Sequence, residues 1–156
     1  MSRCCAHARR PGFTLLELLV VMVIAAIAIM MAAPTIGRGL MQTSAQQAAA
    51  TIAQDLQRGL TTASRTRRPV TFTINTDSMV YHLADGVDGT VFNTRHIGEG
   101  SDFGLSSLIA SHTTITMLPN GTIGAATLPV QFTIRAGDHR RAIRITRAGM
   151  IYVEAL

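Results

Sequence analysis

An almost unbroken apolar run lies near the N-terminal end of the sequence. From residue 13 to residue 33 only Thr14 and Glu17 are polar. An α-helix rises about 1.5 Å per residue, so this run would measure about 30 Å, the thickness of the hydrocarbon core of a bilayer. The pattern therefore predicts a transmembrane helix over residues 13–33.

A second helical pattern follows the apolar run. Pro34 lacks a backbone N–H and should bend the helix, and Gly37 and Gly39 follow closely. Either Pro34 ends the first helix or the helix continues after a kink. We expect continuation, because residues 41–64 hold no proline and carry a narrow apolar stripe at helical spacing. The stripe consists of Ala45, Ala48, Ala49, Ile52, Leu56, Leu60 and Ala63. Residues 34–65 are thus predicted to form an amphipathic helix that docks on a sheet.

The hydrophobic period changes to two after residue 65. Residues 70–74 and 79–83 alternate on either side of the turn residues 75–78, which predicts a β-hairpin. Further strands are predicted at 113–118, 129–135, 142–146 and 150–153. The side chains expected to point inward are Val130, Phe132, Ile134, Ile143, Ile145, Ile151 and Val153. Residues 84–111 lack a sustained period and are predicted to be a long loop, with a short strand or turn near 90–92 or 105–109. The fold class is α+β.

Charge and cysteine content limit the classes of function and the membrane orientation that the sequence allows. All fourteen basic residues are arginines, against nine acidic residues. Arg3, Arg9 and Arg10 precede the apolar run and no comparable cluster follows it directly, which predicts a cytoplasmic N-terminus. Without these three the excess positive charge is small, which argues against a general nucleic-acid binder. The two cysteines, Cys4 and Cys5, are neighbours and do not suit a structural disulfide.

No catalytic or metal-ligating arrangement is evident in the sequence. The histidines are scattered without metal-ligand spacing. Residues 85–89 resemble half of a calcium loop, but they lack the ligand spacing and the terminal glutamate of an EF-hand. We interpret them as turn residues and expect no cofactor, no metal ion and no enzymatic activity.

Glu17 is the anomaly in the apolar run, because a carboxylate on a membrane helix costs about 2.5 kcal/mol or more and needs a partner. Together with Gly12 and Phe13 it carries a family resemblance. The residues around them, 9–21, resemble the class III signal of type IV pilins and type II secretion pseudopilins. The resemblance implies that a prepilin peptidase/N-methyltransferase cuts after Gly12 and methylates Phe13. It also implies that Glu17 pairs with the N-terminal amine of a neighbouring subunit during assembly. Residues 13 and 17 share one helix face, which suits this role.

Two other interpretations of the apolar run remain. It could be a secretory signal with the small residues Ala32 and Ala33 before the cut, although a glutamate in the apolar region argues against this. It could also be a plain membrane anchor in which Glu17 reaches water at the cytoplasmic face. The anchor does not account for the Gly-Phe junction.

The second half of the chain resembles the GspH/FimT group of minor pseudopilins. The resemblance rests on residues 118–122, 132–134, 143–145 and 149–151, in their order behind the signal. It implies a type IV pilin-like fold with a leader at 1–12, the membrane helix at 13–33, a periplasmic helix at 34–65 and a β-rich periplasmic domain at 66–156. Pro34 matches the proline common at this place in pilins.

The function implied is that of a minor pseudopilin of a bacterial type II secretion system, at or near the tip of the periplasmic pseudopilus. It would be a single-pass protein of the inner membrane. Its partners would be the peptidase, the major and other minor pseudopilins, the assembly platform and the lipid bilayer. The alternative is a FimT/FimU-type minor pilin serving pilus priming or DNA uptake.

Five arginines near the C-terminal end could gather on one edge of the sheet and contact phosphates of DNA under the alternative. They are Arg135, Arg140, Arg141, Arg144 and Arg147. A solvated basic turn, or salt bridges between subunits, accounts for them more simply.

Overall fold

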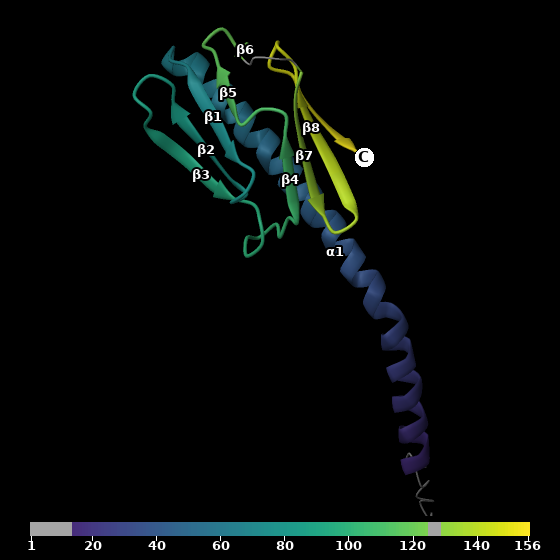
Figure 1. The fold of residues 1–156 in the computed structure, drawn as a ribbon. Coiled ribbons are helices and arrows are strands. Elements are labelled where there is room, and N and C mark those ends of the chain that lie inside the picture. The colour runs from purple at the N-terminus through teal and green to yellow at the C-terminus, as the bar shows by residue number, and fades with distance from the viewer. Residues whose placement is uncertain (1–13, 125–128) are drawn as a thin grey trace, which may run out of the picture. The chain divides into compact units, whose positions relative to one another are not determined.

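The computed structural model of the chain describes residues 14–124 and 129–156, and for residues 32–38 it describes the backbone only. It contains one long helix, α1 (Leu15–Thr66), followed by nine strands (Figure 1). The chain divides into two compact units between Arg38 and Gly39.

The first unit holds the start of α1. The side-chain oxygen of Thr14 accepts a hydrogen bond from the backbone N–H of Glu17 at 3.2 Å, so Thr14 is the N-cap of the helix. Side chains 14–31 are exposed, and the backbone is helical on both sides of Pro34. Among the residues that the structure describes, no helix is both long and apolar enough to cross a membrane. The predicted leader, including Gly12, lies outside the described residues, as does Phe13.

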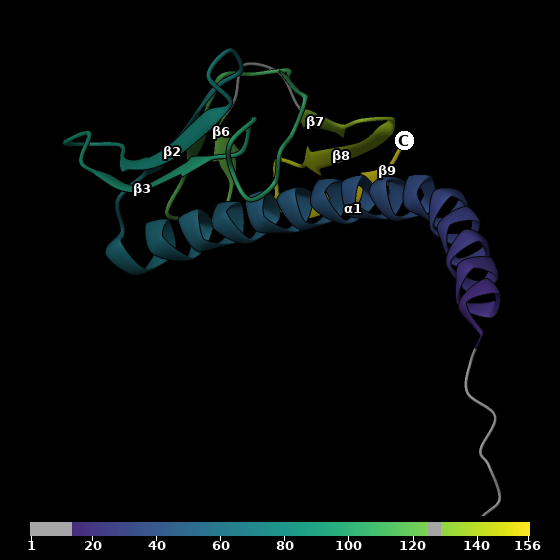
Figure 2. The ribbon, with the colours of Figure 1, turned by 90° about the horizontal axis from the view of Figure 1, so that it is seen from below.

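The second unit packs α1 against two antiparallel sheets. Sheet A has the order β3-β2-β1-β5-β6, and sheet B has the order β4-β7-β8-β9. The strands of sheet A are β1 (Val70–Asn75), β2 (Val80–Asp85), β3 (Val91–His96), β5 (Thr114–Met117) and β6 (Ile123–Gly124). The strands of sheet B are β4 (Ser107–Ala110), β7 (Val130–Ala136), β8 (His139–Ile145) and β9 (Ile151–Ala155). The part of α1 that follows Gly39 runs along the strands (Figure 2). The α+β fold class is confirmed.

One hydrophobic core joins the helix to both sheets. The predicted stripe of α1 is buried except for Leu60, which is half-buried and packs against the core. Phe72 from sheet A and Phe132 from sheet B meet at the centre, with ring centroids 5.6 Å apart. Gly59 lets the helix approach sheet A closely, since a Cβ there would lie 2.5 Å from the sulfur of Met117. Small side chains on α1 therefore set the distance between helix and sheet.

The strand predictions hold in part. The hairpin is confirmed by the pairing of β1 with β2. The region predicted as a long loop contains β3 and β4, close to the places where short strands were expected. β3 was not predicted as a full strand because none of its side chains is fully buried and only its first two residues, Val91 and Phe92, are apolar. β6 was not predicted.

Two further corrections concern sheet B. β8 begins at His139, three residues earlier than predicted. The prediction missed these residues because they are a histidine and two arginines, which do not continue the apolar pattern of the strand. Gly137, in the turn before β8, has a φ of 57°, the left-handed region that glycine adopts without strain. Val153 was expected to point into the core, and it is 44% exposed because β9 is an outer strand.

A buried carboxylate connects α1 to sheet A. Asp55 is 2% exposed, although its neighbours on the same helix face are apolar. Its Oδ2 accepts a hydrogen bond from the Tyr81 hydroxyl at 2.6 Å and another from Nε of Arg95 at 2.9 Å. Arg58 on the helix approaches Oδ1 at 3.9 Å. Because Tyr81 lies in β2 and Arg95 in β3, this Asp55 cluster links the helix to two strands.

The cluster shifts the protonation of its members in a consistent direction. Burial, followed by the hydrogen bond to Asp55, raises the pKa of Tyr81 well above its usual range, so the phenol remains neutral. Burial is the largest single effect on the pKa of Arg95 and lowers it, but the hydrogen bond to Asp55 and the further interactions with Tyr81 and Asp55 together outweigh burial, so the pKa is raised. A neutral phenol and a charged guanidinium thus both donate to the carboxylate.

Asp55→Ala should lower the free energy of unfolding by about 2–4 kcal/mol, because it leaves the Tyr81 hydroxyl and the Arg95 guanidinium without their acceptor. Tyr81→Phe should cost only about 1 kcal/mol, since Arg95 still holds the carboxylate. The exposed Asp102 provides the control, because Asp102→Ala should stay within about 0.5 kcal/mol. Urea unfolding followed by circular dichroism measures all three. Equal midpoints for Asp55→Ala and Asp102→Ala would refute the role of the cluster.

Candidate functional site

Glu17 lies in the first turn of α1, among exposed apolar side chains. Leu15, Leu16, Leu18 and Leu19 surround it in the sequence and are all exposed. Within the part of the chain that the structure describes, Glu17 forms no ion pair. A negative charge in the first turn interacts favourably with the helix dipole, and the N-cap at Thr14 orders the backbone that carries it. Glu17 is therefore a carboxylate held at the start of an apolar helix and accessible to another molecule.

The structure places three of the five arginines on one face. Directly opposite residues of an antiparallel pair point to the same side of a sheet. Arg135 pairs with Arg140, and Arg144 pairs with Gln131, so these three arginines share the outer face of sheet B. Arg141 pairs with the buried Ile134 and points to the other face. Arg147 follows β8 in the turn before β9. The expected gathering of all five on one edge is therefore only partly present.

Acidic groups lie beside two of the three arginines on the outer face. Arg135 donates to the carbonyl oxygen of Gly137 at 2.6 Å and lies 3.8 Å from Asp138. Nη2 of Arg144 lies 3.6 Å from Oε2 of Glu154 on β9. Exposed ion pairs of this kind contribute little to stability, but they reduce the positive field of the face.

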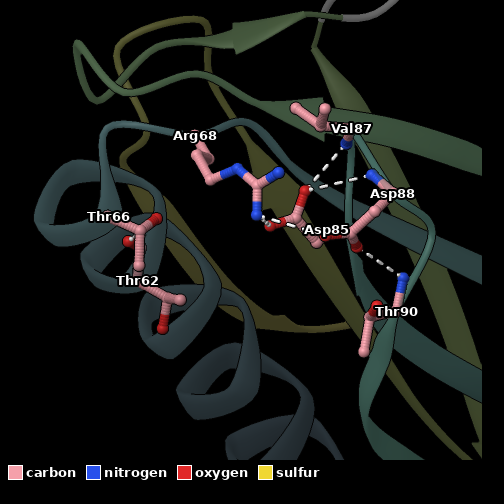
Figure 3. Close-up of polar contacts among 7 residues, drawn as sticks. All are labelled: Thr62, Thr66, Arg68, Asp85, Val87, Asp88 and Thr90. Atoms are coloured by element: carbon pink, nitrogen blue, oxygen red, sulfur yellow. Dashed lines mark hydrogen bonds and ion pairs between the residues drawn. The ribbon is translucent and has the colours of Figure 1, made fainter.

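A cavity of about 480 Å³ lies near the C-terminal end of α1 (Figure 3). Its lining residues are Thr62, Thr66, Arg68, Val70, Asp85, Asp88, Thr90 and Phe92.

Ion pairs close one side of the cavity. Nη1 of Arg68 lies 2.8 Å from Oδ2 of Asp85 and 3.2 Å from Oδ2 of Asp88. The backbone N–H of Val87 donates to Asp85 at 2.8 Å, and that of Thr90 donates to Asp88 at 2.9 Å.

These contacts bear on the segment that resembles half of a calcium loop. Hydrogen bonds from the backbone and then the side chain of Thr90, together with Arg68, lower the pKa of Asp88. The acidic side chains of the segment bind turn amides and an arginine. Over residues 14–124 and 129–156 the structure contains no group of three or more His, Cys, Asp or Glu side chains placed to hold a metal ion.

Sequence reasoning missed Asp55 altogether. It lies three residues after Ile52 and four before Gly59, so it shares the buried face of the helix with both. A charged residue at a core position of an amphipathic pattern was the available signal. Its partners could not be found in the same way, because Tyr81 and Arg95 lie on strands whose pairing the sequence does not specify.

Comparison with known proteins gives one family match and several similar structures. A family model for the prokaryotic N-terminal methylation motif matches residues 7–33. A search of curated proteins finds no significant match.

The solved structures that resemble this chain are a minor pilin and a minor pseudopilin. The type IV minor pilin FimU of Pseudomonas aeruginosa strain PAO1 matches in two crystal forms. One has a TM-score of 0.61 at 20% identity, covering 74% of this chain and 94% of FimU. The other has a TM-score of 0.58 at 21% identity, covering 71% and 96%. The minor pseudopilin EpsH of the type 2 secretion system of Vibrio cholerae has a TM-score of 0.57 at 16% identity, covering 72% and 97%.

These findings concern different parts of the chain. The methylation motif covers the region of Gly12, Phe13 and Glu17, and the similarity in structure covers most of the rest. At such low identities the similarity concerns the fold. The chain therefore carries a prokaryotic N-terminal methylation motif and has a type IV pilin-like fold.

Proposed function

We propose that this chain is a minor pseudopilin of a type II secretion system, assembled at or near the tip of the periplasmic pseudopilus that drives exoprotein export. The observation that carries the proposal is the methylation motif at residues 7–33 in a chain with a type IV pilin-like fold. It is supported by the similarity to EpsH, which is a minor pseudopilin of a type 2 secretion system. In this role the chain is a structural subunit, and its activity is assembly.

Processing would prepare the chain for assembly. A prepilin peptidase would cut after Gly12 and methylate the new N-terminus at Phe13. The arginines of the leader would stay in the cytoplasm, residues 13–33 would anchor the chain in the inner membrane, and the remainder would lie in the periplasm. A bend at Pro34 would let the two parts of the helix follow different directions.

Glu17 would then set the register of the subunit in the filament. Its carboxylate is exposed and has no ionic partner in the described part of the chain, so a positive group from another subunit can reach it. The N-terminal amine of a neighbour is such a group. In an apolar environment an unpaired carboxylate and an unpaired ammonium are each costly. The subunit would therefore favour the axial position in the filament at which its Glu17 meets the amine of the neighbour.

The second unit would present surfaces to the major pseudopilin, the other minor pseudopilins and the assembly platform. One such surface is the outer side of α1, where Gln46, Gln47, Gln54, Gln57 and Arg58 are exposed. The Asp55 cluster fixes the helix on sheet A and so determines which side chains lie on that side.

A FimT/FimU-type minor pilin of a type IV pilus, serving pilus priming or DNA uptake, is the second candidate. The similarity to FimU, described as a type IV minor pilin, favours it. Arg135, Arg140 and Arg144 on the outer face of sheet B would contact phosphates, and binding would weaken steeply with salt. The acidic groups beside Arg135 and Arg144 argue against a strong DNA-binding face.

Glu17→Ala should leave removal of the leader intact and impair incorporation into filaments, because only the partner for the neighbour's amine is lost. Mass spectrometry measures processing, and immunoblotting of isolated filaments measures incorporation. Glu99→Ala removes the same charge from an exposed position of the second unit and should incorporate normally. Normal incorporation of Glu17→Ala would contradict the role given to this carboxylate.

Deletion of the gene in its native host separates the two candidate functions. We expect exoproteins to disappear from the medium while DNA uptake is unchanged, and we expect a plasmid copy of the gene to restore secretion. Loss of uptake with normal secretion would reject the secretion proposal in favour of the pilus subunit. In that case the triple change of Arg135, Arg140 and Arg144 to glutamine would be the next variant to test.

A further inference from the structure

The free edge of β9 has backbone groups available for another strand. In the β8–β9 ladder the N–H of Thr146 donates to the carbonyl of Met150 at 3.0 Å, and the N–H of Leu156 donates to the carbonyl of Arg140 at 3.3 Å. Antiparallel pairs alternate between hydrogen-bonded and non-hydrogen-bonded positions. The even-numbered residues of β9 therefore bond to β8. The N–H and C=O groups of Ile151, Val153 and Ala155 point away from it.

The other outer strands of the two sheets are blocked or short, whereas β9 is neither. Among the described residues β6 has two residues and β4 has four. β3 pairs irregularly at Leu83/Ala84 and directs Arg95 inward to Asp55. Short edges, irregular pairing and inward charges are the devices by which proteins prevent edge-to-edge association. β9 pairs regularly with β8 over five residues and contains no proline.

The side chains at this edge are also incompletely covered. Val153 lies on the same face as the buried Ile143, yet it is 44% exposed, and Leu156 is 66% exposed. A strand added beside β9 would cover part of this apolar surface as well as bonding to the backbone. An occupant in extended conformation with apolar side chains at alternate positions fits both requirements.

We propose that β9 pairs with β9 of a second copy of this chain, antiparallel and centred on Val153. In this register Val153 faces Val153 of the other copy as a hydrogen-bonded pair, and Ile151 faces Ala155. Tyr152 faces Glu154, so the acidic residue meets a phenol rather than a second carboxylate. The only charged residue of β9 is thus compatible with self-pairing. The result is a symmetric contact that joins two sheets B into one continuous sheet.

This contact is independent of the function proposed above. It uses backbone groups of the second unit, while filament assembly would use Glu17 and the apolar helix. A failure of one would therefore leave the other standing.

Cysteine cross-linking tests the register. In the full chain, purified in detergent with Cys4 and Cys5 replaced by serine, Val153→Cys is oxidised with copper phenanthroline. A hydrogen-bonded antiparallel pair places the two Cα atoms about 5.5 Å apart, within the range for a disulfide. We expect most of this variant to become a disulfide-linked dimer, and Ile109→Cys on the β4 edge to remain monomeric. Equal cross-linking of both variants, or of neither, would overturn the proposal.

A proline variant tests the hydrogen bonds. Val153→Pro removes an N–H that points away from β8, so β9 can keep its pairing within the chain while a second strand is blocked. In the same cysteine-free background, with Tyr152→Cys and Glu154→Cys added as the facing pair, dimer formation should be lost when Val153→Pro is introduced. Unchanged dimer formation would overturn the proposal. The thermal unfolding midpoint shows whether the variant remains folded.

Discussion

The Asp55 carboxylate, buried between α1 and sheet A, is the interaction on which the arrangement of the second unit depends. Burial of a charge is costly unless hydrogen bonds replace its lost hydration. Here the hydroxyl of Tyr81 and the guanidinium of Arg95 supply them at 2.6 and 2.9 Å. Apolar packing alone tolerates small rotations of a helix on a sheet, whereas these two bonds have strict geometry. The helix is therefore held at one rotation.

The fixed rotation has consequences on both sides of the helix. Toward the sheets it places Gly59 over Met117 and Leu83, whose side-chain ends would have to shift to make room for a larger residue at position 59. Away from them it leaves a side rich in glutamine exposed, and from residue 42 to the end of α1 this side carries no large exposed apolar residue that would favour non-specific association. The filament subunit proposed above would need both properties, because the same helix would have to bind its own domain tightly and present a reproducible surface to its neighbours.

The sequence predicted the features that depend on periodicity and missed those that depend on pairing. The stripe from Ala45 to Ala63 and the hairpin of β1 and β2 were predicted because their apolar residues recur at a regular interval. The strands β3 and β6 were not predicted as such, because outer strands with exposed or few side chains leave little pattern. Arg141 was grouped with its neighbours, yet it points to the opposite face. The strand that contains it begins earlier than the apolar pattern suggests.

The candidate site divides in a similar way. Gly12, Phe13 and Glu17 were proposed from a resemblance, and the family model covers the region that contains them, although their roles remain predictions. Asp55 was visible only as a charge out of place on a buried helix face. Its role cannot be inferred without its hydrogen-bond partners Tyr81 and Arg95, which are far from it in sequence and become its neighbours only when the sheet forms.

The most direct test of the account is the mass of the mature chain purified from membranes of its native host. If the chain is processed as proposed, the mature protein has the mass of residues 13–156 with one added methyl group, located on Phe13 by fragmentation. The protein from a Gly12→Leu strain should retain the leader. A wild-type chain that begins at Pro34 or nearby would indicate a secretory signal, and an uncut chain would indicate a plain anchor. Either result would contradict the account.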